Sequence, residues 1–400
     1  MHLPRLPAQP HLTYCTNIHA GESWPDIRDS LREFVPPIRD ALTQGAPMGI
    51  GLRLSGQAAD TLIQPEHLQA FQAQLRELNA YVFTVNAFPY GRFHGTQVKQ
   101  DVYQPDWRHP ERLRYTQVCA DILAALLPEG VNGSISTVPV GFRDAADTEQ
   151  ALSDILSHLL QTVAHLVRLH RQTGQHIALA LEPEPACFLE TTQEAADFML
   201  QKVRQPGPVA QLAQWLNIST EQAMQALETH LGVCFDVCHS AVEFEDPAQT
   251  MQQLRASRIA IPKIQLSSAL RVPRMQASLL PTLQGFDDAV YLHQVVVQQA
   301  DGLQRHLDLP QAMAAFQAGE AEGEWRVHCH VPVFLADAGS ISTTQAQLLQ
   351  TLAACKAEGY SSHLEVETYT WDVLPAELKT DGKAQAIARE LQFVHHALTT

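Results

Sequence analysis

Three apolar segments of this sequence each end in a carboxylate residue. The segments are IALALEPEP (177–185), GVCFDVCHS (232–240) and SHLEVETYTW (362–371). Because side chains alternate between the two faces of a strand, Glu182, Asp236 and Glu367 share their face with small or polar residues, opposite a face of large aliphatics. Such strands suit a barrel, in which the aliphatics pack on helices and the acids lie at the mouth. Acids that converge there repel one another unless protons or a cation neutralise them, so the pattern predicts a divalent metal site.

Two histidines are candidates to complete this ligand set. His328 and His330 are two residues apart in RVHCHVPVF, so in a strand both side chains can point at one centre. We favour His330, which is nearer the end of the run. Hard ions such as Mg2+ and Mn2+ prefer carboxylate oxygens, and an added imidazole shifts the preference toward Mn2+, Co2+ or Zn2+. The alternative is that each acid caps a helix or pairs with an arginine, and that the histidines only hydrogen-bond within a polar seam.

Other polar residues near predicted strand ends are candidates for holding a substrate. Arg53 would be a natural clamp for a carboxylate or phosphate, although it would also serve to neutralise the acids. Asn86, His94 and His19 are further candidates at the mouth. His239 lies three residues beyond the aspartate of FDVCH, where it would hold substrate or act in proton transfer.

Strand-like and helix-like segments alternate from end to end. The strand candidates are 12–18, 48–55, 80–88, 133–140, 176–182, 232–238, 261–267, 326–334 and 362–368. Helical periodicity is clearest in 24–44, 65–79, 109–127, 148–173, 192–203, 219–230 and 343–358. This alternation favours a parallel sheet with right-handed crossovers. We therefore predict an α/β fold, a (β/α)8 TIM barrel that forms a single domain over 1–400.

Nine strand candidates compete for eight places in such a barrel. The surplus candidate comes after the seventh strand, where residues 268–325 interrupt the alternation of strand-like and helix-like segments. A segment of this length should carry structure of its own, and we interpret it as an insertion on the active-site face. The run RVHCHVPVF then either forms an extra strand beside the barrel or lies over its mouth.

Composition limits the classes of function. The 400 residues carry a formal net charge of −16, whereas proteins that grip nucleic acid usually show a basic footprint. No apolar run reaches the roughly 18 residues expected of a membrane helix, and MHLPRLPAQPHL lacks the apolar core of a secretory signal. Seven cysteines without a CxxC pair argue against a disulfide framework. We expect a cytoplasmic protein with a small-molecule partner, no nucleic acid and no membrane segment.

At the acidic strand ends the chain resembles the xylose isomerase-like barrels, a superfamily of sugar isomerases, sugar epimerases and endonuclease IV. The matching residues are Glu182 in LALEPEP, Asp236 with His239 in FDVCH, and Glu367 in LEVET. The resemblance implies that these three carboxylates hold a divalent metal and that Glu182 and Glu367 exchange a proton with the substrate. In an isomerase or epimerase of this kind, His239 and Arg53 would orient the substrate.

The sequence departs from this superfamily at the seventh strand. The superfamily has a metal-binding histidine there, whereas this chain has Gln265 in KIQLSS. Either Gln265 or His330 would then complete the metal centre, and an altered centre would put isomerase chemistry in question.

A narrower resemblance, to the EboE family, spans nearly the whole chain. It rests on the segments TYCTNIHAGESW, GLRLS, TVNAFPYGRFHG, VYQPDW, KIQLSSALRVPR, YLHQV, RVHCHVPVF and HLEVETYTWDVLP. EboE proteins are metabolite traffic proteins of a bacterial gene cluster linked to precursors of secondary metabolites, which implies contact with other proteins of that cluster. The first hypothesis is a metal-dependent isomerase or epimerase acting on a sugar-like metabolite or a secondary-metabolite precursor. The alternatives are a non-catalytic metabolite-binding or trafficking factor and, disfavoured by the acidic charge, an endonuclease IV-like repair enzyme.

Overall fold

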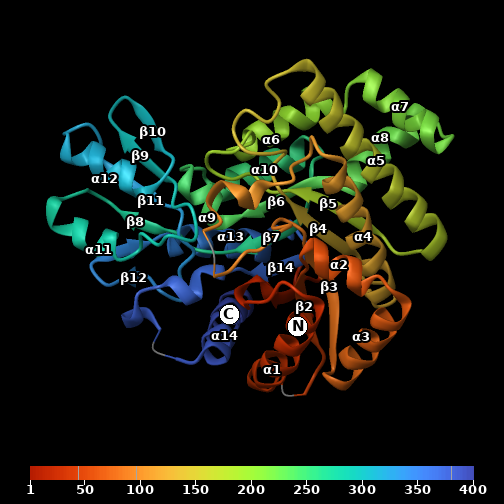
Figure 1. Cartoon of the computed structure of the whole chain (residues 1–400), viewed down its shortest axis with the longest axis horizontal. Helices are drawn as coiled ribbons and strands as arrows, with labels where there is room; N and C mark the ends of the chain where they lie inside the picture. Colours follow the sequence, from red (N-terminus) through yellow and green to blue (C-terminus); the bar gives the residue numbers. More distant parts are fainter. Residues whose placement is uncertain (44, 96, 380) are drawn as a thin grey trace.

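The computed structural model describes residues 1–43, 45–95, 97–379 and 381–400, and within them eight parallel strands form a barrel (Figure 1). The strands, in spatial order, are β1 (His11–Tyr14), β14 (His363–Val366), β7 (Ala260–Leu266), β6 (Leu231–Asp236), β5 (Ile177–Leu181), β4 (Gly133–Thr137), β3 (Ala80–Asn86) and β2 (Met48–Arg53). A parallel bridge between Cys15 and Gly51 links the two ends of this order, β1 and β2, and so closes the barrel. The predicted (β/α)8 barrel is confirmed.

Closure of the barrel depends on a residue without a side chain at position 51. A Cβ on Gly51 would collide with the Glu365 carboxylate and would lie 2.9 Å from the carbonyl oxygen of Tyr14. The Gly51 amide instead donates to Thr13 Oγ1 at 3.1 Å. The close approach of β1 and β2 therefore requires glycine here.

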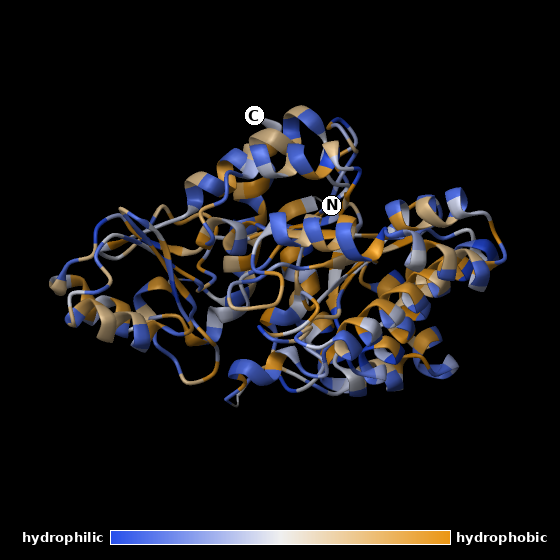
Figure 2. Ribbon diagram, turned by 90° about the horizontal axis from the view of Figure 1, so that it is seen from above, coloured by the Kyte–Doolittle hydropathy of each residue, from blue (hydrophilic) through white to orange (hydrophobic). Residues whose placement is uncertain are grey.

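Helices cover the outside of the barrel. They are α1 (Trp24–Thr43), α2 (Gly56–Leu62), α3 (Pro65–Glu77), α4 (Pro110–Leu126), α5 (Glu149–Thr173), α6 (Thr192–Phe198), α7 (Pro206–Leu216), α8 (Thr220–His230), α10 (Pro247–Ala256), α13 (Gln345–Glu358) and α14 (Lys383–Thr399). The outward aliphatics of the strands, such as Leu179 and Val233, are fully buried beneath them, and apolar residues concentrate along the central strands in Figure 2. No helix in the described ranges is both long and apolar enough for a membrane crossing.

The strand predicted at 232–238 ends two residues early. Asp236 Oδ1 accepts a hydrogen bond from the backbone N–H of His239 at 2.9 Å, which caps the short helix α9 (Val237–Val242). A capping aspartate satisfies an otherwise unpaired N–H of the first helical turn. The chain therefore turns into a helix at the barrel rim, and His239 belongs to that helix.

A second sheet accounts for the surplus strand candidate. In the described part of the chain it has six strands in the order β10 (Gly302–His306), β9 (Val295–Gln299), β11 (Glu324–Val327), β8 (Leu270–Val272), β13 (Ile341–Thr343) and β12 (Asp337–Ala338). With α11 (Leu280–Gln284) and α12 (Leu309–Gln317) it forms the lobe beside the barrel in Figure 1. RVHCHVPVF thus begins as β11 of this sheet and then leaves it at residue 328.

A buried carboxyl group on α14 ties the outer helices to the loops at the mouth. Glu390 Oε1 accepts hydrogen bonds from the Val333 amide at 3.1 Å and from Thr368 Oγ1 at 2.6 Å. Burial raises the pKa of Glu390 to about 7, and these hydrogen bonds offset only part of that effect. The folded protein therefore holds this proton more tightly than the unfolded chain does.

We expect Glu390→Gln to flatten the dependence of stability on pH. Folding raises the pKa of Glu390 from 4.5 to about 7. The contribution of Glu390 to the free energy of unfolding is therefore complete below pH 4.5 and is lost as the pH rises through about 7. Across that window the wild type should lose about 3 kcal/mol of unfolding free energy relative to the variant. Urea unfolding at a series of pH values measures this difference, with the exposed Glu320→Gln as control. Parallel curves for wild type and Glu390→Gln would contradict the assignment.

Candidate metal centre

Three carboxylates converge at the mouth of the barrel. Glu182 follows β5, Asp236 ends β6 and Glu367 follows β14, and one oxygen of each lies within 4.8 Å of the others. All three are buried, with at most 3% of their surface exposed. They meet because parallel barrel strands end at the same rim, as the alternation in the three segments predicts.

Neighbouring side chains hold two of these carboxylates in place. Glu367 Oε1 accepts from the amide nitrogens of Asn17 at 2.7 Å and Asn86 at 3.0 Å. Asp236 Oδ1 accepts from Ser267 Oγ at 2.8 Å in addition to its capping bond. These donors come from the ends of β1, β3 and β7, so strands around the barrel fix the geometry of the centre.

Other ligand atoms at the centre have no hydrogen-bond partner in the part of the chain that the structure describes. Among the described residues, Glu182 Oε2, Asp236 Oδ2 and His330 Nε2 are buried and accept no hydrogen bond. A buried polar atom without a partner costs about 1–3 kcal/mol. Three such atoms at one centre indicate that a group from outside the chain completes the site.

The acids of the centre differ in how readily they ionise. Burial, and next the neighbouring acids, raise the pKa values of Glu182 and Glu367 well above the usual range. Burial acts in the same direction on Asp236, but the adjacent imidazoles and the hydrogen bonds to Oδ1 outweigh it and lower the pKa of Asp236. Without a cation, the centre therefore keeps protons on the glutamates and the charge on the aspartate.

His330 is oriented as a metal-binding histidine would be. Its Nδ1 donates to the backbone carbonyl of Glu367 at 2.9 Å, which leaves the lone pair on Nε2. Burial lowers the pKa of His330 to about 4, so the ring is neutral at physiological pH. One ligand atom each of His330, Asp236 and His239 lie within 4.8 Å of one another. The structure thus places His330, the histidine favoured from the sequence, beside Asp236.

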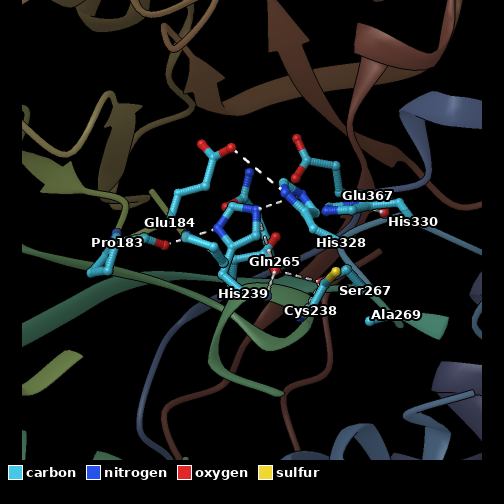
Figure 3. Close-up of polar contacts among 12 residues, drawn as sticks. Pro183, Glu184, Cys238, His239, Gln265, Ser267, Ala269, His328, His330 and Glu367 are labelled. Carbon is cyan, nitrogen blue, oxygen red and sulfur yellow. Dashed lines mark hydrogen bonds and ion pairs between the residues drawn. The ribbon is translucent and has the colours of Figure 1, made fainter. Parts of the chain in front are cut away.

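Two more histidines face each other beside the carboxylates (Figure 3). The Nε2 atoms of His239 and His328 are 3.2 Å apart. The Glu184 carboxylate lies beside them, with one oxygen within 4.8 Å of a nitrogen of each ring, and it accepts from Tyr103 at 2.7 Å. The flanking prolines left the direction of Glu184 open in the sequence, and in the structure its side chain faces this centre.

An ion pair and an amide form the floor beneath the centre. Lys263 is fully buried and its ammonium group contacts the Glu365 carboxylate. Burial disfavours the charge on Lys263, but the Glu365 carboxylate outweighs it and raises the pKa of the ammonium group. Gln265, paired in register with Asp236, accepts from Cys234 Sγ at 3.0 Å and leaves its Nε2 unpartnered within the described chain. Gln265 therefore lies next to the proposed ligands with one amide atom uncommitted.

A cavity opens above these groups. Its lining includes Glu182, Glu184, His239, His328 and Glu367, together with Asn17, Asn86, Lys99 and several aromatic residues. Phe93, Tyr291 and Tyr369 form one wall, with ring centroids 5.1–5.3 Å apart. These rings come from the loop after β3, the second lobe and the loop after β14. The cavity therefore has a polar floor and an aromatic wall.

The four residues predicted to bind substrate lie in different surroundings. Asn86 lines the cavity. His94 forms a hydrogen bond with Tyr291 of the aromatic wall, with 2.9 Å between its Nδ1 and the tyrosine hydroxyl oxygen. The described residues that line the cavity do not include Arg53 or His19. Arg53 donates to Gly21, Glu22 and Gly91 at 2.7–3.0 Å, and His19 stacks on Phe34 with ring centroids 4.2 Å apart. Arg53 thus joins two loops, and the structure does not bring its guanidinium to the acids.

Strand periodicity in the sequence does not mark every residue at the site. Tyr103, at the end of the 3-10 helix Lys99–Tyr103, and Tyr291, in the second lobe, line the cavity. Gln294, also in the second lobe, contacts Glu184. Only their contacts across long sequence separations, such as Gln294 with Pro185 at 3.0 Å, place them at the centre.

Comparisons with known proteins found similar solved structures. No family model matches the sequence, and no curated protein matches it either. Three similar solved structures are a xylose isomerase domain protein from Planctomyces limnophilus, the IOLI protein with a bound zinc atom, and D-allulose 3-epimerase from Methylomonas sp. in complex with D-allulose. Their identities are 14%, 12% and 10%, with TM-scores of 0.46, 0.47 and 0.46. The alignments cover 87%, 97% and 98% of this chain and 88%, 98% and 98% of theirs.

Proposed function

We propose that this chain is a divalent-metal-dependent isomerase or epimerase that acts on a small, hydroxylated carbonyl compound. The observation that carries the proposal is the convergence of Glu182, Asp236 and Glu367, with His330 beside Asp236 and with buried ligand atoms that have no partner among the described residues. Carboxylate oxygens with one imidazole nitrogen suit Mn2+, Co2+, Zn2+ or Mg2+. Gln265 would be the fifth ligand if its amide oxygen turned toward the ion.

The residues of the centre have separate tasks in this proposal. A bound ion would supply Lewis-acid chemistry, polarising a carbonyl oxygen of the substrate and acidifying the adjacent C–H bond. Glu182 and Glu367 would exchange that proton with the substrate carbon as general base and general acid. Asn17 and Asn86 hold one oxygen of Glu367 and leave the other for this task. His239 would orient a substrate oxygen from the cavity side.

The cavity supports a small substrate with both polar and C–H surfaces. The aromatic wall of Phe93, Tyr291 and Tyr369 offers ring faces and edges, and the asparagines offer hydrogen-bonding groups. A sugar-like molecule presents hydroxyl groups at its rim and C–H groups on its faces, which matches this division. The finer proposal, an EboE-type protein acting on a secondary-metabolite precursor, is supported by the sequence segments that resemble that family.

A second candidate is a non-catalytic metabolite-binding or trafficking factor. The observation that favours it is Gln265, because an amide rather than an imidazole stands on β7 beside Asp236. A centre altered in this way would keep the binding pocket and lose the chemistry.

Proton exchange in D2O separates the two candidates. Metal-stripped protein and protein reloaded with Mn2+ or Co2+ would be incubated with a panel of ketoses, and deuterium next to the carbonyl measured by NMR. Exchange that requires the metal is the expected result. Saturable ligand binding without exchange by any loaded form would favour the binding factor, and a protein that takes up no divalent ion would overturn the proposal.

A further inference from the structure

One side of the cavity is apolar. Its lining comes from the segment between β3 and α4 and from the second lobe, and it includes Phe88, Phe93, Val98, Val102 and Leu292. We call these five residues the apolar side. The two segments adjoin, since the Val98 amide donates to the Val290 carbonyl at 2.9 Å. Two acids of the carboxylate centre line the same cavity, so one ligand can contact both the acids and the apolar side.

The tyrosines near the apolar side use their hydroxyl hydrogens within the protein. Tyr103 donates to Glu184 at 2.7 Å. The Tyr291 hydroxyl lies 2.9 Å from His94 Nδ1, and His94 Nε2 donates to the Asn17 carbonyl, which can only accept. Burial lowers the pKa of His94, so the ring is neutral and its Nδ1 accepts from Tyr291. Both tyrosines therefore offer ring carbons to a ligand, and no free hydroxyl hydrogen.

The charge of Lys99 is also used within the protein. Among the described residues that line the cavity, Lys99 is the only lysine or arginine, and its ammonium group pairs with Asp308 at 2.5 Å. Asp308 is itself fixed, because its other oxygen accepts from the backbone N–H groups of His293 and Leu309 at 3.0 Å. A lysine whose ammonium group is paired in this way can still line a cavity with its methylene carbons. Lys99 therefore adds to the apolar lining and brings no unpaired charge.

We propose that the natural substrate carries an uncharged apolar substituent, an alkyl or aryl group, which binds on the apolar side while its hydroxylated carbonyl part lies at the acids. This inference rests on the proposed function, which places the carbonyl group there. A hydroxyl group buried against Phe88, Val98 or Leu292 would lose its hydrogen bonds to water and gain none from these side chains. An apolar group gains affinity there from the surface that it removes from water. A fully hydroxylated sugar would use only the polar half of the cavity.

A series of 1-hydroxy-2-alkanones tests the proposal. Each member has the same adjacent hydroxyl and carbonyl groups, and the alkyl chain grows from methyl in hydroxyacetone to hexyl in 1-hydroxy-2-octanone. Isothermal titration calorimetry should show the Kd falling about fourfold for each CH2 group that becomes buried. The titrations are made with metal-stripped and with Mn2+-loaded protein, so that the dependence on chain length is measured whether or not the metal binds.

The variant Leu292→Asn locates the alkyl chain. Its Kd for 1-hydroxy-2-octanone should rise about tenfold, and its Kd for hydroxyacetone should stay within about twofold of the wild-type value. Leu303→Asn is the matched control, because Leu303 lies in the same lobe and is 36% exposed. Val102→Thr, which adds a hydroxyl group at nearly constant volume, replaces Leu292→Asn if thermal unfolding shows that the latter does not fold.

The outcomes separate this inference from the proposed function. A Kd that does not change along the series, or that changes equally in Leu292→Asn and Leu303→Asn, would overturn the apolar subsite. If ketoses still exchanged deuterium in a metal-dependent way, the proposed function would stand without it. A steep dependence on chain length that Leu292→Asn weakens, with no exchange of any member, would support the apolar subsite and count against the isomerase. Absence of saturable binding by every member would overturn the inference.

Discussion

Glu182→Gln should weaken divalent metal binding at the carboxylate centre by about 100-fold or more. Glutamine keeps the shape of the side chain but removes the charge from a buried oxygen, Oε2, that has no partner among the described residues. The same change should stabilise the metal-free protein near neutral pH, because burial and the nearby acids raise the pKa of Glu182 and its ionisation disfavours folding. The variant would then be more stable than the wild type without metal and less responsive to added metal.

Thermal unfolding with and without Mn2+ or Co2+ measures both effects together. At a free metal concentration of about 100 times Kd, the wild type should gain about 2.7 kcal/mol, and the variant should gain much less. The exposed Glu322→Gln should behave as the wild type does. An unchanged metal response in Glu182→Gln would exclude Glu182 as a ligand, and a less stable metal-free variant would contradict the account of its ionisation.

Lys263→Met should destabilise the protein by about 3–5 kcal/mol, since it leaves one partner of a buried ion pair alone. Lys263 and Glu365 are both fully buried inside the barrel, directly below the centre. Methionine retains most of the volume of lysine, so the loss would reflect the unpaired Glu365 carboxylate more than a cavity. An unneutralised Glu365 would also repel Glu367, one of the proposed ligands.

The double variant Lys263→Met/Glu365→Gln isolates the electrostatic part of this loss. Urea unfolding should show that the second change recovers a large part of the stability, because no charge then remains without a partner. The exposed Lys202→Met serves as the control. A double variant no more stable than Lys263→Met would mean that packing, and not charge, accounts for the destabilisation.

The contacts of the centre that cross between loops could not be predicted. Arg53 was a reasonable substrate clamp by residue type and strand position, yet the loops at Gly21 and Gly91 fold over its guanidinium and use its donors. His328 meets His239 only because the second lobe brings its strand-like run back over α9. Such contacts depend on loop conformations that residue type and local periodicity do not specify.

The sequence by itself determined the barrel and the meeting of Glu182, Asp236 and Glu367. Two local rules suffice for that result: side chains alternate along a strand, and parallel strands in a barrel end at one rim. The tertiary structure alone decided that His239 and His328 meet and that Arg53 binds Glu22 and two loop carbonyls. The physical reason is that these arrangements arise from backbone carbonyls and side chains up to 89 residues apart in the chain, whose positions follow from packing of the whole molecule.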